Sequence, residues 1–582
     1  MNTAKMILVT LNSKYIHSSL ALRSIKAYCK DSYSGISIME FTINDPLDKI
    51  VSALAAQHPD LLCFSCYIWI IRMTLDVIDT IKKILPDCRI LLGGPEVSYD
   101  GKELMTHNSL IDYIIVGEGE ETFREFLSCI NESEDMTEVR GLIWRRGDAV
   151  IVNESRAPVA LDSIPFAYGD GLAGLQDKII YYESSRGCPY RCQYCLSSTT
   201  GPVRFLSIER VKRDLEYFVK SGVKQVKFVD RTFNCNPGRA KEILRYLIEL
   251  NGSTNFHFEM AGDLIDDEML DILSQAPTGM FQLEIGVQST TIETLKAIKR
   301  KTDLAGIEKS VSRIIQADNI HVHLDLIAGL PEENIDSIAR SVNSVLGLAP
   351  HRLQLGFLKM LKGSGLRNNA ELYDYRYTSY PPYEVLSNNV LSFPDIARLK
   401  QIEELIELYY NSHCFDRSME YISLLMQGDL YQFFNNMAGY WEWKGYFKYS
   451  HNIVSLYEHL AEYAESIQNL DIKLFKELLR FDYAMREKPN RYPGGLEPVE
   501  NRDLSKKAMD AFVRNAELTS LLKGCEGYTS KQLYRLLHME VFDHRMDFKG
   551  TDAYSEGRSI VVYNYLYRQG VLKRPQTLQL TI

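Results

Sequence analysis

The first 150 residues alternate continuous apolar runs with amphipathic stretches. Residues 6–12 (MILVTLN) form an apolar run typical of a buried strand, and residues 19–31 (SLALRSIKAYCKD) repeat apolar positions at helical spacing. Further apolar runs lie at 59–69, 89–94 and 112–116. Repeated strand–helix units predict a parallel sheet with helices on both faces. Such a sheet binds ligands outside the carboxyl ends of its strands.

A connector rich in proline and glycine, residues 151–178, leads into a second alternating region at 179–378. Six strand-like runs occur there. A complete eight-unit barrel takes about 250 residues, so six units in this length predict a partial (β/α)6 barrel. From 379 to 582 the pattern changes to amphipathic stretches such as 395–412. The predicted fold class is therefore α/β for the first two domains, followed by a mostly α-helical C-terminal domain.

Composition and charge narrow the class of protein. The chain has 582 residues, of which 45% are hydrophobic and 24% charged, as in ordinary globular proteins. The net charge of -10 argues against a general nucleic-acid binder. The longest apolar run, 61–71, is too short to cross a bilayer, and the N-terminus lacks the apolar core of a signal peptide. We expect a cytoplasmic enzyme that engages neither membranes nor nucleic acid.

Three cysteines lie close together in the segment 184–198 (SSRGCPYRCQYCLSS). Cys188, Cys192 and Cys195 are separated by gaps of three and two residues. A structural zinc ion needs a fourth ligand, which would have to come from elsewhere, such as Cys235 or a histidine. Inert core thiols fit poorly in a segment rich in Gly, Pro and Arg. The favoured interpretation is an iron–sulfur cluster on three thiolates, with one iron open to a small chelating molecule.

This cysteine spacing, in a loop after the first strand of a six-unit barrel, resembles the radical S-adenosylmethionine (SAM) superfamily. The resemblance implies a [4Fe-4S] cluster whose open iron chelates SAM and cleaves it to methionine and a 5′-deoxyadenosyl radical. The later segments 228–233 (FVDRTF), 283–289 (LEIGVQS) and 327–333 (IAGLPEE) resemble the family's motifs in the right order. The residues that the resemblance places near SAM are Tyr194, Asp230, Glu259, Glu284, Gly286, Gln288 and Gly329.

The three carboxylates in that set have an alternative interpretation. Asp230, Glu259 and Glu284 lie inside apolar strand patterns, where a carboxylate is rare unless it is paired or functional. Each could bind SAM, a structural arginine or a backbone N–H.

Small residues follow three predicted strands of the first domain. They allow tight turns, and they also let a bulky ligand approach the backbone. Their order resembles the Rossmann-like cobalamin-binding domain that precedes many radical SAM cores, over residues 5–145. A dinucleotide site is excluded because no G-x-G-x-x-G follows the first strand. The residues that the resemblance places against cobalamin are Ser65, Gly93, Gly94, Gly117, Glu118 and Gly119.

The cobalt ligand is a departure from the classical cobalamin domain. The family motif Asp-x-His-x-x-Gly is absent, so the lower ligand is either His17, in the first loop, or none. Cys63 and Cys66 form a C-x-x-C pair inside an apolar run, and we expect both to be buried core thiols.

Together the resemblances imply a cobalamin-dependent radical SAM enzyme that works anaerobically. It would methylate an unactivated carbon of a small-molecule substrate, with electrons from a reductant such as flavodoxin or ferredoxin. Alternatives are an oxidative cyclase or rearrangement enzyme similar to magnesium-protoporphyrin monomethyl ester cyclase, a tRNA methylthiotransferase, and a cobalamin or redox sensor. The C-terminal segment with Trp441 and Trp443 is expected to form a helical core or, alternatively, a substrate cap over the barrel mouth.

Overall fold

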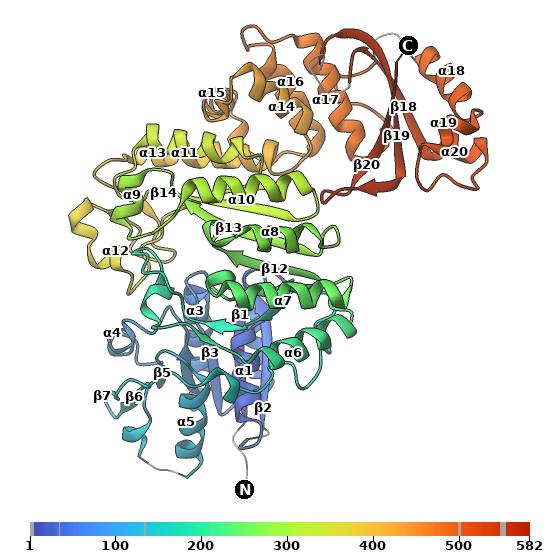
Figure 1. Cartoon of the computed structure of the whole chain (residues 1–582). Coiled ribbons are helices and arrows are strands. Elements are labelled where there is room, and N and C mark those ends of the chain that lie inside the picture. Colours follow the sequence, from blue (N-terminus) through green and yellow to red (C-terminus); the bar gives the residue numbers. More distant parts are fainter. Residues whose placement is uncertain (1–4, 34, 133–134, 499–501, 547–553, 582) are drawn as a thin grey trace.

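The computed structural model describes residues 5–33, 35–132, 135–498, 502–546 and 554–581 (Figure 1). Along the chain an N-terminal sheet domain is followed by an open barrel and then by a mostly helical region. This order confirms the predicted fold class. Within the described residues, no helix combines the length and apolarity needed to cross a membrane.

The N-terminal domain is a seven-stranded sheet in the order β2-β1-β3-β4-β5-β6-β7. The first five strands are parallel, and the last two run antiparallel at one edge. Helices α2, α3 and α4 form a buried core with one face, and α1 and α5 with the other. The elements are β1 (Met6–Asn12), α1 (Leu20–Cys29), β2 (Ile36–Thr42), α2 (Leu47–Ala55), β3 (Leu61–Ser65), α3 (Ile71–Ile84), β4 (Arg89–Gly93), α4 (Gly101–His107), β5 (Tyr113–Ile115), α5 (Glu120–Glu132), β6 (Leu142–Arg146) and β7 (Ala149–Val152).

The second sheet has six parallel strands in the order β15-β14-β13-β12-β11-β8. Its outer strands β8 and β15 do not pair with each other, so the barrel is open, as predicted. In β13 and β14 every second residue is buried and apolar, which turns the polar residues between them toward the barrel interior. The elements are β8 (Ile180–Tyr182), α6 (Ile208–Lys220), β11 (Gln225–Phe228), α7 (Pro237–Leu250), β12 (Asn255–Met260), α8 (Asp267–Ser274), β13 (Phe281–Gln288), α9 (Ile292–Ala297), α10 (Leu304–Ala317), β14 (His321–Ala328), α11 (Ile335–Gly347) and β15 (Arg352–Phe357).

Two short hairpins accompany the barrel. The strands β9 (Ser185–Arg186) and β10 (Arg204–Phe205) pair on either side of the cysteine loop. After β15, residues 358–390 cross the barrel mouth and contain α12 (Gly365–Asn368), β16 (Arg376–Tyr377) and β17 (Val385–Ser387).

The remaining chain is mostly helical, and it ends in a three-stranded antiparallel sheet that the sequence analysis did not anticipate. The helices α13 and α15 share the hydrophobic core of the barrel, and Trp441 is fully buried there. The elements are α13 (Phe393–Leu405), α14 (Asp416–Leu425), α15 (Leu430–Lys444), α16 (Ile453–Ala464), α17 (Ile472–Arg486), α18 (Arg502–Phe512), α19 (Ala516–Ser520), α20 (Ser530–Leu536), β18 (Leu537–His544), β19 (Glu556–Gln569) and β20 (Arg574–Thr581).

The C-terminal sheet contacts the amino end of the barrel. Near the β19–β20 turn, the Val571 amide donates to Asp318 Oδ1 at 3.4 Å. Asp318 caps α10 just before β14, so it lies at the amino end of the barrel strands. The helical-core interpretation is therefore confirmed for Trp441. Trp443 is exposed, so the helical-core interpretation does not hold for that residue. The alternative, a substrate cap over the barrel mouth, stays a prediction.

Candidate functional site

The cysteine loop leaves the carboxyl end of β8 and is enclosed by the β9–β10 hairpin. Gly187, directly before Cys188, has φ +108, and a Cβ there would lie 2.9 Å from the Pro202 carbonyl. Only glycine therefore fits this turn. Burial raises the pKa of Cys188, and the neighbouring Cys195 and Cys192 thiols raise it further, because all three lie close together.

Three hydrogen bonds fix the loop. The Gln193 amide donates to the Ile298 carbonyl at 2.9 Å, and the Gln193 carbonyl accepts from the Leu366 amide at 2.8 Å. The Ser198 hydroxyl donates to the Cys195 carbonyl at 2.6 Å. The loop is thus held between the segment after α9 and the segment that crosses the mouth.

The three thiols come from one short loop, in which Cys192 is buried and Cys188 and Cys195 are half-buried. Among the residues that the structure describes, no three His, Cys, Asp or Glu side chains converge as they would on one metal ion. In an iron–sulfur cluster each thiolate binds a different iron.

Arg300, which could not be identified from the sequence motifs, lies next to the cysteines. Its Nη1 lies 3.8 Å from Cys192 Sγ and 3.2 Å from the Tyr194 hydroxyl, and its Nη2 donates to the Gly286 carbonyl at 2.5 Å. Its Nε is buried and has no partner among the described residues. A buried guanidinium with a free donor suits a carboxylate ligand such as that of SAM.

Two of the predicted SAM carboxylates already have partners within the chain. Glu284 accepts from Lys227 Nζ at 3.1 Å and from His257 Nε2 at 3.0 Å. Burial alone would raise the pKa of Glu284, but these hydrogen bonds and charges lower it to about 2. Glu284 is therefore an internal ion-pair partner, and its contact with SAM stays a prediction.

Asp230 is also occupied. Its carboxylate accepts from the Ser184 amide at 2.8 Å, the Ser184 hydroxyl at 2.6 Å and the Ser185 hydroxyl at 2.7 Å. Burial raises the pKa of Asp230 to about 6. This geometry assigns Asp230 to fixing the start of the cysteine loop, the structural alternative considered for these carboxylates.

Two other carboxyls line the barrel interior without such partners. Glu259 accepts no hydrogen bond from another described residue, and burial raises its pKa to about 7. Asp325 has a buried, unpartnered Oδ1 among the described residues, and burial raises its pKa to about 8. Sequence reasoning missed Asp325. It is a charged residue inside the apolar run 320–328, and the same pattern had identified Glu284 as a candidate. Both carboxyls can accept donors from a ligand.

The backbone near these groups is irregular. Gln288 has φ +70, at a register shift between β13 and β14 that spans Gly286 to Gln288. Such strained positions and bulges cluster at binding sites. Gly329 has φ +92 after β14, and its carbonyl accepts from the Tyr375 hydroxyl at 2.9 Å. Gly329 therefore joins the strand end to the segment that crosses the mouth.

At the N-terminal sheet, the predicted cobalamin residues have different surroundings. Ser65 is buried and donates to Thr10 Oγ1 at 2.8 Å. The Gly93 carbonyl accepts from the Cys66 amide at 2.7 Å. Gly94 has φ +112, and a Cβ there would lie 2.7 Å from the Cys66 carbonyl. Gly94 is therefore required by packing within the protein, whatever binds beside it.

In the loop after β5, one glycine leaves open space for a ligand and another packs within the protein. Gly117 has φ +79 and open space where a Cβ would be, which suits the approach of a ligand. A Cβ on Gly119 would lie 3.2 Å from Ile25 Cδ1, so Gly119 packs against α1. Glu118 pairs with Arg186 at 3.1 Å and with Arg204. Glu118 thus joins the two domains, and its contact with cobalamin stays a prediction.

The first loop and the two N-terminal cysteines are also accounted for. His17 Nδ1 lies 2.6 Å from the hydroxyl of Tyr181 in β8, and burial is the main cause that lowers its pKa. One ring nitrogen is thus engaged at the domain interface. Cys63 and Cys66 are buried, and burial raises the pKa of both thiols, as expected for core thiols.

The carboxyl edge of the N-terminal sheet faces the cysteine loop. Ile68, three residues after β3, packs in the same hydrophobic cluster as Tyr194. Glu96, in the loop after β4, accepts from Lys362 at 3.1 Å and from the Tyr383 hydroxyl at 2.6 Å. The loops after β3, β4 and β5 and the cysteine loop therefore border one region between the two domains.

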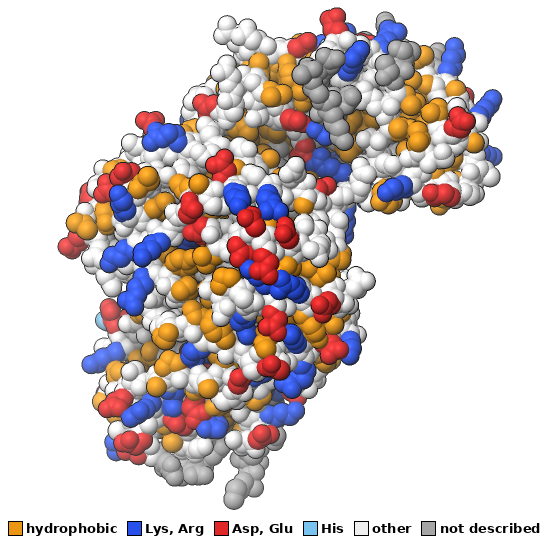
Figure 2. Space-filling model, in the orientation of Figure 1, with side chains coloured by type: hydrophobic (Ala, Val, Ile, Leu, Met, Phe, Trp, Pro, Cys, Tyr) orange, Lys and Arg blue, Asp and Glu red, His pale blue; other side chains and the backbone are white. Residues whose placement is uncertain are grey.

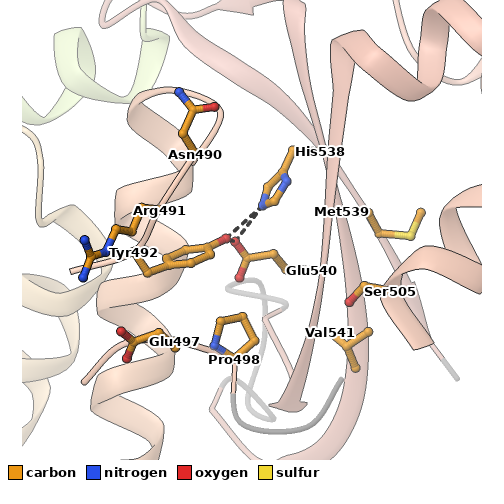
Figure 3. A pocket seen from close by; sticks show the side chains of 10 residues that line it. All are labelled: Asn490, Arg491, Tyr492, Glu497, Pro498, Ser505, His538, Met539, Glu540 and Val541. Atoms are coloured by element: carbon orange, nitrogen blue, oxygen red, sulfur yellow. Dashed lines mark hydrogen bonds and ion pairs between the residues drawn. The ribbon is translucent and has the colours of Figure 1, made fainter. Parts of the chain in front are cut away.

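A cavity of about 490 Å³ lies far along the chain, between β18 and the segment before α18 (Figure 3). Its floor is Glu540, which accepts from the Tyr492 hydroxyl, from His538 Nε2 at 2.8 Å and from Arg480 Nε at 2.9 Å. The Glu540 carboxylate is therefore already paired with donors from the residues around it. The cavity is separate from the cysteine site.

Comparison with known families divides the chain as its structure does. Residues 6–127 match the B12 binding domain, and residues 182–345 match the Radical SAM superfamily. Residues 371–563 match a family of unknown function, DUF4080.

Individual proteins are also similar to this chain. The chain is 28% identical over 347 residues to the cobalamin-dependent radical SAM methyltransferase TokK of Streptomyces tokunonensis, covering 56% of this chain and 50% of TokK. It is 27% identical over 326 residues to the anaerobic magnesium-protoporphyrin IX monomethyl ester cyclase of Synechocystis sp., covering 52% of this chain and 62% of the cyclase. The chain thus spans less than two thirds of these relatives.

A solved structure, the cobalamin-dependent SAM radical enzyme OxsB, superposes with a TM-score of 0.59 at 14% identity, over 92% of this chain and 83% of OxsB. At that identity the likeness shows a shared fold. The chain therefore combines a B12-binding domain with a radical SAM domain, and it is homologous to the cobalamin-dependent radical SAM methyltransferases.

Proposed function

We propose that this protein is a cobalamin-dependent radical SAM enzyme that methylates an unactivated carbon of a small molecule. The observation that carries the proposal is the shared border of the two predicted cofactor sites. The loops after β3, β4 and β5 face the cysteine loop, and Ile68 and Tyr194 pack against the same hydrophobic cluster. When bound, the cluster and SAM supply a 5′-deoxyadenosyl radical, and cobalamin supplies the methyl group.

Different residues of the chain would bind the cluster, SAM and cobalamin. Cys188, Cys192 and Cys195 hold the cluster, with the loop pre-shaped by Gly187. Arg300 offers a free donor to the SAM carboxylate.

On the barrel wall, Glu259 and Asp325 accept from the amino or hydroxyl groups of SAM. Gln288 and the backbone at Gly286 and Gly329 shape the same wall, and Tyr194 borders the adenine.

On the opposite side, the edge of the N-terminal sheet holds cobalamin. Gly117 leaves open space for its approach, and the backbone at Ser65 and Gly93 borders the same edge. Residues 358–390 close the mouth and keep water from the reacting groups.

The test is anaerobic reconstitution with iron, sulfide, SAM and cobalamin. We expect about four irons per chain, bound cobalamin, and slow formation of 5′-deoxyadenosine under a strong reductant. Replacing the three cysteines together with alanine should remove the iron and the deoxyadenosine but leave cobalamin uptake intact. A variant that keeps its iron would contradict the cluster assignment, and a wild-type protein that takes up no cobalamin would contradict the other half.

A second candidate is an oxidative cyclase or rearrangement enzyme, which the similarity to the Synechocystis cyclase favours. The two candidates differ in the fate of SAM. A methyltransferase yields S-adenosylhomocysteine in step with 5′-deoxyadenosine once its substrate is present, because a second SAM restores the methyl group. Deoxyadenosine alone would favour the second candidate.

A further inference from the structure

A strongly basic segment lies on the outer side of the cysteine loop. Residues 296–301 (KAIKRK), at the end of α9 and in the loop that follows it, carry four cations in six residues of a chain whose net charge is -10. Lys296, Lys299 and Lys301 are exposed, and so is Arg191 in the cysteine loop itself. Figure 2 shows Lys and Arg side chains gathered on this flank of the barrel, beside α9 and α12.

The same segment touches the cysteines on its inner side. The Ile298 carbonyl accepts from the Gln193 amide at 2.9 Å, and Ile298 is fully buried. Arg300 turns inward to Cys192 Sγ at 3.8 Å. The segment that carries the three exposed lysines therefore also contacts the cysteine loop.

The exposed cations of this flank are not neutralised within the protein. None of Arg191, Lys296, Lys299 and Lys301 forms an ion pair with a described residue, whereas Arg186 and Arg204 in the neighbouring hairpin are paired with glutamates. The acidic residues in the surrounding segment 291–303 are Glu293 and Asp303. Asp303 Oδ1 accepts from the Ala305 amide at 3.1 Å as the N-cap of α10. The flank keeps a net positive charge.

We propose that the basic flank, defined by Arg191, Lys296, Lys299 and Lys301, is the docking surface for a small acidic electron-transfer protein of the flavodoxin or ferredoxin type. The proposal rests on the proposed function, which requires one electron for each SAM cleaved. That electron passes from the reduced partner, which is left oxidised by one electron, to the site held by the three cysteines. Complementary charge steers such a transient encounter and orients it without a large apolar interface.

The test compares the wild-type holoenzyme with the double variant Lys296→Glu, Lys301→Glu. Binding to immobilised flavodoxin and, in a second arm, ferredoxin is measured at low and at high salt. We expect the dissociation constant to rise at least about tenfold in the variant, and the wild-type affinity to fall with salt. The matched control is Lys506→Glu, Lys507→Glu, which reverses two exposed charges in α18, and it should bind as the wild type does.

Activity is measured with two kinds of reductant. Deoxyadenosine formation driven by a subsaturating acidic protein should fall about tenfold in the Lys296→Glu, Lys301→Glu variant, while formation driven by titanium(III) citrate should be unchanged. Equal binding of both carriers to wild type and variant, or binding of neither carrier to the wild type, would overturn the docking proposal. Loss of titanium-driven activity in the wild type would instead refute the proposed function.

Folding of the variant is checked separately. If the double variant loses its iron, the double variant Lys296→Gln, Lys301→Gln is used in its place. The same comparison of binding with the wild type then tests the docking proposal.

Discussion

At the scale of single residues, the carboxyls of the barrel interior fall into two groups. Asp230 and Glu284 are saturated by partners within the chain. Glu259 and Asp325 are buried without comparable partners, and burial raises their pKa values to about 7 and about 8. A buried acceptor with no donor costs free energy, so the second group is the one that gains from a ligand.

The raised pKa of Asp325 predicts a pH dependence of stability in the protein without SAM. An unfolded aspartate titrates near 3.9, so between about pH 4 and pH 8 the folded state holds the extra proton. Unfolding free energy therefore falls as pH rises through this window, by at most about 1.4 kcal/mol per pH unit for this group. Denaturant unfolding of wild type and Asp325→Asn at pH 5 and pH 8 measures it. We expect a smaller fall in the variant, and equal falls would contradict the assignment.

Arg300 carries a second prediction. Arg300→Gln should keep its iron, because the three thiolates remain, but should bind SAM about tenfold to a hundredfold more weakly, since hydrogen bonds to charged groups contribute about 1.5–3 kcal/mol. Equilibrium dialysis with SAM, together with iron analysis, measures both quantities. The neighbouring Lys299→Gln, which changes an exposed side chain, is the control. Unchanged SAM affinity in Arg300→Gln would remove Arg300 from the site.

At the scale of elements, the β9–β10 hairpin connects the two cofactor domains. Arg186 and Arg204 face each other across the hairpin, and both pair with Glu118 of the N-terminal domain. Arg186 also pairs with Glu120 at 2.8 Å. Cys188 follows two residues later, so the loop after β5 and the cysteine loop share one rigid connection.

The contribution of this connection to stability can be measured by replacing the carboxylate that both arginines share. Glu118→Gln leaves two partly buried arginines with a weaker partner, and we expect a loss of about 1–3 kcal/mol in the free energy of unfolding. Glu154→Gln, whose pair with Arg140 lies on the surface, should cost well under 1 kcal/mol. Denaturant unfolding of both variants makes the comparison. Equal losses would show that the hairpin adds no more than a surface pair.

The elements also show what the sequence could predict. All six barrel strands were predicted, because apolar residues recur in each at strand-like spacing and turn residues lie near its ends, although β8 and β11 are short. The edge strand β2 was missed, since most of its residues are only half-buried and its apolar run is broken by Ser37 and Glu40. The C-terminal sheet was missed because its strands follow a long series of amphipathic helices, from which the whole region was interpreted.

The candidate site could be predicted only in part. Cysteine spacing identifies the loop, because the chemistry depends on a short sequence separation. Glu284 and Asp325 look equivalent in sequence, each a charge inside an apolar strand, and only the placement of Lys227 and His257 decides which one is free. Glu118 and Gly94 illustrate the same limit, since their partners come from other loops.

At the scale of the whole molecule, the three parts have separate places around the barrel. The N-terminal sheet meets the mouth of the barrel, residues 358–390 clamp it there through Lys362 and Tyr383, and the C-terminal region packs on α11 and the amino end. We propose the space between the two domains as the place for chemistry, with cobalamin on one side and the cluster on the other.

The central claim is that cobalamin and the cluster share this space, and electron paramagnetic resonance tests it without a known substrate. In reconstituted protein carrying cob(II)alamin, the account predicts that reducing the cluster shortens the spin relaxation of the cobalt signal, because two paramagnetic centres lie close together. The variant with Cys188, Cys192 and Cys195 replaced by alanine should show the unperturbed cobalt signal. A cobalt signal that relaxes identically in both proteins, with the cluster present and reduced in the wild type, would contradict the account.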